Sequence, residues 1–148
     1  MTLLHLRDIA DRHGRPFSIV SEILDVRNRE LAEVTRADDF IVSDRLISLI
    51  LAQISENRER AAVFQDLFDP MGSELYFKPV KEYVRLGQPL NFYTVVEAAR
   101  RRGEVAIGYR RHAEVYDPGK AYGVHTNPAK SQPVVFSAED RIIVLAEE

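Results

Sequence analysis

The arginines at positions 100–102 and 110–111 form the one concentration of basic side chains in this sequence. Guanidinium groups bind phosphate through paired hydrogen bonds, so such a cluster suggests a phosphate or nucleotide site. A structural role is the alternative, because arginines in the last turn of a helix complement the negative end of its dipole, and Glu97 and Glu104 would neutralise them locally. The candidate anion ligands are Arg100, Arg101 and Arg110.

Glu22 is an acidic residue in an unusual place, because the residues around it are apolar and are predicted to form a strand. A carboxylate inside such a strand is unfavourable unless it is paired or bound to a cation. Open α/β sheets also bind ligands near the carboxyl ends of their parallel strands. Glu22 is therefore a candidate cation ligand, with a structural pairing as the alternative. The aspartates Asp38 and Asp39 fit a turn, and Asp44 fits the start of a helix.

The sequence shows no arrangement of residues typical of a catalytic site. There is no cysteine, which excludes thiolate nucleophiles, disulfides and cysteine-based zinc sites. The four histidines have no helical metal-ligand spacing, and His5 and His13 are expected on the surface of a first helix. No glycine-rich phosphate loop or nucleophile elbow is present. The sequence therefore predicts no catalysis, and no cofactor is assigned to the chain itself.

The charge balance does not favour polyanionic partners. The chain has 20 Lys and Arg against 23 Asp and Glu, a net charge of −3, which creates no general attraction for nucleic acid or an anionic membrane. No aromatic residues alternate with the arginines, as base stacking would require, so we expect no nucleic-acid partner. No apolar run nears the ~20 residues that cross a bilayer. The polypeptide itself is expected in the cytosol. This expectation is compatible with a longer membrane protein of which the chain is a part.

The elements that must position these residues begin with a strand, helix, strand, helix pattern. The strands are predicted over 17–24 and 38–43, and the helices over 25–36 and from 43 to about 57. Such a unit belongs to a parallel sheet, whose strands are normally covered on both faces and occur in sheets of several strands. Only a helical segment, 3–13, precedes it here. We therefore expect the tail of a doubly wound α/β domain.

A small α+β lobe is predicted after a break at 69–72, where Asp-Pro-Met-Gly combines a helix stop with turn residues. Within this lobe, Thr94 and Glu97 fit a capping box at the start of a helix, and Gly103 fits the left-handed residue that ends it. The expected domains are 1–69 and 70–148. The elements predicted around and after the break are helices over 57–68 and 94–102 and strands over 73–80, 104–110 and 140–148.

The helix over 43–57 has more apolar surface than one neighbour can cover. At 100° per residue its apolar side chains span an arc of roughly 200°, about twice what a helix lying on one surface buries. Burying six aliphatic side chains is worth on the order of 10 kcal/mol, too much to leave half of them in water. We expect one side to pack on its own lobe and the other on a second copy; a wholly intrachain core helix is the alternative. The predicted dimer-interface residues are Leu46, Ile47, Leu49, Ile50 and Ile54.

These segments resemble RCK domains, the cytosolic gating modules of potassium channels and Trk-type transport systems. The stretch IVSEILDVRNRELAEVTRADDFIVSDRLISLILAQ is similar to the last strands and the crossover helix of such a domain. Among these proteins the chain most resembles the CASTOR/POLLUX group of ion channels, through LDVRNRELAEVTRADDFIVSDRL, FYTVVEAARRRGEVAIGYR and DRIIVLAEE. The part after Asp69 is similar to a TrkA-C-type lobe, and the resemblance covers almost the whole chain.

The resemblance implies the C-terminal portion of a Rossmann-like RCK lobe with crossover helices, followed by a TrkA-C-like lobe. In RCK domains the helix after the last strand packs across a two-fold interface, which implies a homodimer. In a calcium-gated relative, acidic side chains two residues apart on this strand help hold the ion. Glu22 matches the first position, but Leu24 replaces the second. Arg36 stands where the family often has glycine, which implies a turn without positive φ.

The function implied by the resemblance is that of a non-catalytic regulatory fragment of a potassium or cation channel, in which several such lobes form a gating ring under the pore. The implied partners are further copies of the chain and the membrane pore domain of the parent protein, and calcium or a nucleotide is a candidate ligand in that parent. Two alternatives are open. One is a free-standing ligand-binding subunit of a cation transporter, and the other is a small dimeric enzyme that uses Arg and Glu groups of the second lobe.

Overall fold

The computed structural model describes residues 5, 8–9, 12–13, 20–23, 39–69 and 71–147. The chain divides into two compact units, Met1–Ala61 (unit 1) and Ala62–Glu148 (unit 2). Helices, a parallel strand pair and antiparallel sheets all occur in the described residues, which confirms the predicted mixture of α/β and α+β structure. The helix expected over 25–36, together with Leu24, Arg36 and Asp38, lies outside the described residues.

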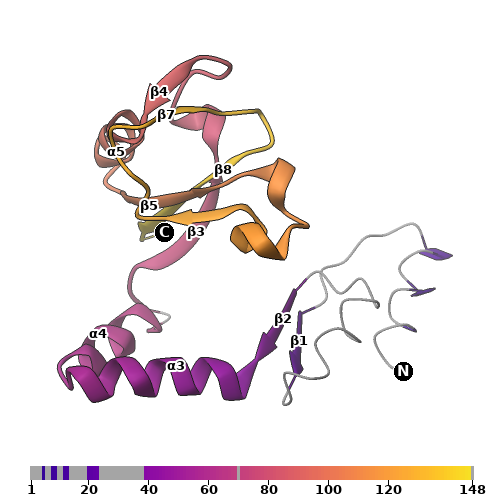
Figure 1. The fold of residues 1–148 in the computed structure, drawn as a ribbon, viewed down its shortest axis with the longest axis vertical. Helices are drawn as coiled ribbons and strands as arrows, with labels where there is room; N and C mark the ends of the chain where they lie inside the picture. Colours follow the sequence, from indigo (N-terminus) through magenta and orange to yellow (C-terminus); the bar gives the residue numbers. More distant parts are fainter. Residues whose placement is uncertain are drawn as a thin grey trace. The chain divides into compact units, whose positions relative to one another are not determined.

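Unit 1 contains a parallel strand pair followed by a long helix (Figure 1). Strand β1 (Val20–Ile23) pairs with β2 (Asp39–Val42), so that Glu22 lies opposite Ile41. Helix α3 (Ser43–Glu56) begins directly after β2. The two strands, their parallel pairing and the long helix are therefore confirmed. Near the N-terminus, His5 and His13 are helical and exposed, also as predicted.

A short connection joins α3 to α4 (Arg60–Leu67) and confirms the helix predicted over 57–68. The guanidinium of Arg60 donates hydrogen bonds to the backbone oxygen of Gln53 at 3.1 Å and to its side-chain oxygen at 2.8 Å. The same group pairs with the carboxylate of Glu56 at 2.8 Å. The carbonyl of Gln53 also accepts the backbone N–H of Asn57 at 3.4 Å, so Arg60 adds a second hydrogen bond at the end of α3.

Unit 2 is built on a four-stranded antiparallel sheet with the order β3-β8-β5-β6, and a separate two-stranded sheet pairs β4 with β7. The sequence did not predict β4 and β7, because three residues are too short to display an alternating pattern. The strands are β3 (Glu74–Pro79), β4 (Pro89–Asn91), β5 (Val105–Arg110), β6 (Val124–Thr126), β7 (Pro133–Val135) and β8 (Arg141–Ala146). The 3₁₀ helices are η2 (Val80–Glu82), η3 (His112–Glu114) and η4 (Pro118–Gly123).

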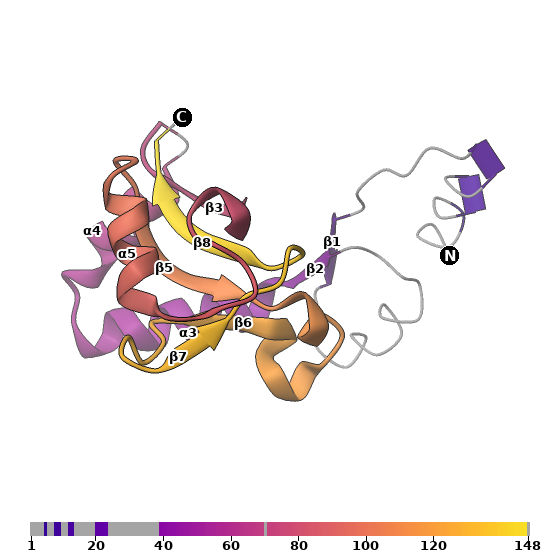
Figure 2. The ribbon, with the colours of Figure 1, turned by 90° about the horizontal axis from the view of Figure 1, so that it is seen from above.

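Helix α5 (Phe92–Arg100) lies along one face of the sheet, as Figure 2 shows. Its inward stripe, with the spacing of one helical face, consists of Phe92, Val95 and Ala99. From β8, the alternate residues Ile142 and Val144 belong to the same cluster and are 0% exposed. Phe136 closes the cluster with its ring edge-on to Tyr109, at 5.2 Å between centroids. Unit 2 therefore encloses its own hydrophobic core.

The start of α5 differs from the predicted one, in which Thr94 caps the helix. The helix begins at Phe92, and the N-cap is Asn91, whose side-chain oxygen accepts the backbone N–H of Thr94 at 3.2 Å. The predicted capping box of Thr94 with Glu97 is therefore wrong. Asparagine is a preferred N-cap because its short side chain reaches the free N–H groups of the first turn. Glu97 lies further along the helix, where arginine side chains bind it.

The end of α5 confirms the prediction that a left-handed Gly103 terminates the helix. Gly103 has φ +76°, the left-handed conformation that glycine adopts without steric strain. Its N–H bonds to the carbonyl of Arg100 at 3.1 Å, and the N–H of Glu104 bonds to the carbonyl of Ala99 at 3.0 Å. This pair of bonds is the Schellman arrangement, which ends the helix and turns the chain into β5.

Candidate functional site

The predicted interface residues lie on α3, and the large apolar side chains of this helix are exposed in the folded chain. Ile50 and Ile54 are half-buried, and none of the side chains described over 45–56 is buried. The exposed fractions are 44% for Leu46, 55% for Ile47, 56% for Leu49 and 60% for Leu51. A soluble chain rarely leaves so continuous an apolar surface in water without a partner for it.

A second exposed apolar row lies on the outer face of the four-stranded sheet. Leu75 on β3 and Val105 on β5 both lie opposite Leu145 of β8, and they are 55% and 59% exposed. Phe77, two residues further along β3, is 50% exposed. The core of unit 2 occupies the other face of the same sheet. No role was predicted for this row from the sequence.

The side chain of Glu22 is exposed. The argument that a buried carboxylate needs a cation therefore does not apply to it, because water solvates an exposed carboxylate. Among the residues that the structure describes, no group of three or more His, Cys, Asp or Glu side chains is placed to hold a metal ion. Cation binding at Glu22 stays a prediction.

The three predicted anion ligands fall into two separate places. Arg100 and Arg101 both donate through Nε to the carboxylate of Glu97, at 2.8 and 2.9 Å. These hydrogen bonds lower the pKa of Glu97 to about 2. Arg110 closes β5 and lies roughly 16 Å along the strand from Val105, where the chain leaves α5. Arg100 and Arg101 therefore already have a carboxylate partner, whereas Arg110 has different surroundings.

Glu104 is the centre of an ionic network that the sequence did not reveal. It is 9% exposed, and its carboxylate accepts hydrogen bonds from Lys78 Nζ at 2.8 Å and from the Tyr83 hydroxyl at 2.5 Å. The guanidinium of Arg102 lies 3.5 Å from the same carboxylate and 4.8 Å from the centre of the Tyr83 ring. The network ties Glu104, which directly precedes β5, to β3 and to the residue that follows η2.

The pKa values in this network follow from burial and hydrogen bonding. Burial by itself raises the pKa of Glu104, but the hydrogen bonds from Lys78 and Tyr83 outweigh it, so the pKa lies below its ordinary value. Burial, and then the hydrogen bond to Glu104, raise the pKa of the Tyr83 hydroxyl. The folded state therefore holds an ionised carboxylate and a neutral phenol, an arrangement suited to structure rather than to proton transfer near neutral pH.

A second polar cluster connects η3 with β6. Glu114 accepts a hydrogen bond from His125 Nε2 at 3.0 Å and pairs with Lys120 at 3.3 Å. The hydrogen bond from His125, together with that from Lys120, keeps the pKa of Glu114 below its ordinary value. The His125 ring stacks on Tyr109, with 4.8 Å between centroids, which joins this cluster to the core.

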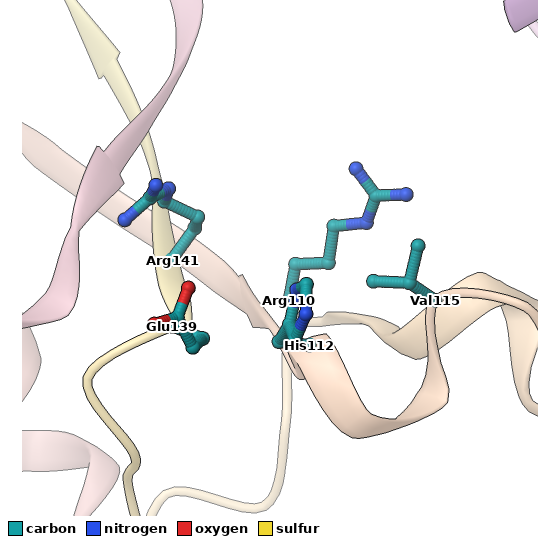
Figure 3. A pocket seen from close by; sticks show the side chains of 5 residues that line it. All are labelled: Arg110, His112, Val115, Glu139 and Arg141. Carbon is teal, nitrogen blue, oxygen red and sulfur yellow. The ribbon is translucent and has the colours of Figure 1, made fainter. Parts of the chain in front are cut away.

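A pocket of about 290 Å³ opens at one end of the four-stranded sheet (Figure 3). Arg110 at the end of β5 and Arg141 at the start of β8 lie opposite each other in the strand register. His112 and Val115 come from η3 and the residue after it, and Glu139 comes from the turn before β8. The pocket contains one of the three predicted anion ligands, together with an arginine that the sequence did not bring to attention.

The comparisons with known proteins give relatives of one kind. No model of a protein family matches the sequence. The chain is 35% identical over 130 residues to the "Probable ion channel CASTOR" of Oryza sativa subsp. japonica, which covers 88% of this chain and 14% of the relative. It is 34% identical over 131 residues to the "Ion channel CASTOR" of Lotus japonicus, with 88% and 14% covered. It is 33% identical over 128 residues to the "Probable ion channel POLLUX" of Arabidopsis thaliana, with 86% and 15% covered.

The chain thus spans about 14% of the length of the curated relatives it matches. Within the described residues, every helix is too short or too polar to cross a bilayer. The similarity to CASTOR and POLLUX channels that the sequence suggested is confirmed at the level of homology, and the finer assignment to RCK and TrkA-C lobes stays a prediction. Over most of its length, the chain is homologous to the CASTOR and POLLUX ion channels of plants.

Proposed function

We propose that this chain is a cytosolic, non-catalytic regulatory module of a cation channel and that it pairs with a second copy through α3. Its relatives are named as ion channels, which supports the channel assignment. The observation that carries the pairing is the exposure of the apolar side chains of α3. In this proposal, residues 1–69 are the end of a Rossmann-like RCK lobe with its crossover helices, and residues 70–148 are a TrkA-C-like lobe.

The pairing follows from the energetics of α3. A leucine or isoleucine side chain gains about 1.5–3 kcal/mol when it moves from water into an apolar contact. Four such side chains on α3 are 44–60% exposed, so much of that free energy is not realised in the single chain. A second α3, related by a two-fold axis, presents the same apolar arc and covers it without any other protein.

The regulatory role follows from the pairing in the proposed parent channel. Several paired modules would form a ring below the membrane pore, which would be the partner of the ring. A ligand that binds one arrangement of the paired modules more tightly shifts the pore toward that arrangement by its difference in affinity, about 1–3 kcal/mol per site. Calcium or a nucleotide is the proposed ligand class, and potassium or another cation is the proposed conducted ion.

The pairing is tested by placing a charge in the middle of the apolar arc. Ile50→Asp should convert a dimer into a monomer or an aggregate, because a carboxylate buried without a partner costs about 3–5 kcal/mol. Ala52→Asp is the matched control, since Ala52 is exposed and lies on the polar side of α3. Sedimentation equilibrium should show loss of the dimer, to a monomer or an aggregate, only for Ile50→Asp. The same mass for both variants would mean that α3 does not form the dimer interface.

The sensing role is tested at Glu22. Calcium should raise the melting temperature of the wild type, by an amount equivalent to about 2.7 kcal/mol when calcium is present at a hundred times its dissociation constant. Glu22→Gln should abolish that rise. Glu59→Gln, which neutralises an exposed carboxylate at the connection between α3 and α4, should leave it intact. If calcium does not change the melting temperature of the wild type, Glu22 is not a calcium ligand.

A further inference from the structure

The pocket at the end of the four-stranded sheet brings two like charges together. Arg110 and Arg141 are directly opposite residues of the antiparallel pair β5 and β8, a position in which like charges repel. Both side chains are half-buried, so water screens them less than it screens surface arginines. Among the described residues, no carboxylate forms an ion pair with either guanidinium. The pocket therefore holds two guanidinium groups without a directly paired carboxylate among the described residues.

The two carboxylates nearest in sequence, Asp140 and Glu139, form no ion pair with Arg110 or Arg141. Asp140 is 4% exposed, but its two oxygens accept the backbone N–H groups of His112 and Ser137, at 2.9 and 2.8 Å. Glu139 lines the pocket and is exposed. In Figure 3 the carboxylate of Glu139 lies on the same side of the pocket as Arg141, away from the guanidinium of Arg110. Glu139 is thus placed as a competitor for an incoming anion rather than as a partner already engaged.

The Arg110 side chain is held in place by an unusual turn. Its Nε donates to the carbonyl oxygen of Tyr122 at 3.3 Å, and its guanidinium lies 5.8 Å from the centre of the Phe77 ring. Tyr122 and the preceding Ala121 have φ values of 54° and 50°, a left-handed conformation unfavourable for both residue types. Backbone strain of this kind is found where a site requires a fixed geometry. Here the strained turn supplies the carbonyl oxygen that holds Arg110 through its Nε.

We propose that this pocket binds the phosphoryl group of a small molecule. A guanidinium offers a planar fork of N–H donors that fits phosphate oxygens, and two arginines approaching from different strands suit a tetrahedral group whose oxygens point in several directions. His112 lines the same pocket and adds a ring nitrogen as a further donor. Because all the lining residues belong to unit 2, the site goes beyond the proposed pairing through α3 and does not depend on it.

The test is a titration of the full chain with inorganic phosphate at constant ionic strength, followed by the NMR signals of arginine Nε–H groups and of the backbone of β5 and β8. Arg141→Gln should weaken phosphate binding by about tenfold or more, because one charge-assisted contact is lost. Arg110→Gln should do the same. Glu139→Gln should tighten binding a few-fold, since it removes the competing carboxylate. Arg85→Gln is the matched control, because Arg85 is exposed, lies outside the pocket and loses the same charge.

Titration with adenosine monophosphate in parallel distinguishes a free phosphate site from a nucleotide site, because a nucleotide site binds the larger molecule more tightly. Either result supports the proposal if Arg141→Gln weakens binding and Arg85→Gln does not. A wild type that shows no shift with either probe overturns it. So does an Arg141→Gln variant that binds both probes as tightly as the Arg85→Gln control. The Ile50→Asp variant should keep wild-type phosphate binding, which separates a failure of this site from a failure of the pairing.

Discussion

Helix α3 in unit 1 and strand β8 in unit 2 both contain runs of large aliphatic residues, but these residues have opposite surroundings. Ile142 and Val144 on β8 are 0% exposed, whereas Leu49 and Leu51 on α3 are 56% and 60% exposed. Apolar content therefore does not decide burial, because burial requires a neighbouring surface. Strand β8 has α5 over one face and strands on both edges, while the described residues of unit 1 supply no comparable cover for α3.

This difference separates the origins of stability in the two units. Unit 2 closes its own core, so substitutions there should change the free energy of unfolding and leave the mass in solution unchanged. The apolar face of α3 is completed from outside in our proposal, so substitutions there should change the mass.

The largest effect is expected in the core of unit 2. Phe136→Ala should lower the free energy of unfolding by about 3–5 kcal/mol, because Phe136 is 2% exposed and its removal leaves a cavity beside Tyr109. Val135→Ala, at a neighbouring position that is 50% exposed, should change it by less than about 0.5 kcal/mol. Urea unfolding measures both. Equal losses for the two variants would mean that the core does not lie where we describe it.

The next largest effect is expected at Glu104. Glu104→Gln should cost about 1.5–3 kcal/mol, since charge-assisted hydrogen bonds with Lys78 and Tyr83 are weakened in a buried place. Glu97→Gln is the matched control, because that carboxylate is partly exposed and its arginine pairs are solvated. Chemical unfolding of both variants should show the larger loss for Glu104→Gln. The reverse order would place the main electrostatic contribution on the surface of α5.

Acid should destabilise unit 2 through the same carboxylates. The folded-state pKa values of Glu97, Glu104 and Glu114 lie below the ordinary value of 4.5, and that of Glu97 is about 2. Between these values the unfolded chain binds protons that the folded chain does not, so stability is present above pH 4.5 and is lost as the pH falls toward about 2. Unfolding free energies measured at a series of pH values check the sign. Constant stability from pH 5 to about pH 3 would contradict it.

The smallest effect is expected at the end of α5. Gly103→Ala should cost about 1 kcal/mol, because φ at this position is +76° and an alanine side chain is strained there. Gly72→Ala should cost less, since φ at Gly72 is not positive and a Cβ would meet only ordinary contacts at 3.7 Å. Thermal unfolding compares the two variants. A neutral Gly103→Ala would mean that the Schellman arrangement adds little to unit 2.

Local sequence patterns predicted most helices and strands. The features that they did not predict depend on contacts between segments that are distant in the sequence. The parallel strands and α3 follow from apolar periodicity, and the end of α5 follows from a single glycine. The sequence pattern indicated Thr94 as the cap, whereas the fold shows that Asn91, three residues earlier, begins the helix. Gly108 is required because a Cβ there would collide with the backbone of His125 on β6, a contact between distant segments.

The candidate sites also depend on contacts that local sequence patterns do not predict. The arginine cluster was visible in the sequence, but the partner of Arg110 across the sheet is Arg141, which stands 31 positions later and belongs to no cluster. Likewise, Glu104 was assigned only to local neutralisation, although its partners Lys78 and Tyr83 come from more than 20 residues away. Spacing along the chain reveals neighbours on one helix or strand, whereas these sites join separate strands.

The mass of the wild-type chain in solution tests the central claim most directly. If α3 is covered by a second copy, sedimentation equilibrium at micromolar concentration should give twice the chain mass of 16.9 kDa. Dilution should then reveal a monomer only at much lower concentration, because interfaces of this apolar kind hold stably paired subunits. A mass of 16.9 kDa at every concentration, with the chain folded, would contradict the account.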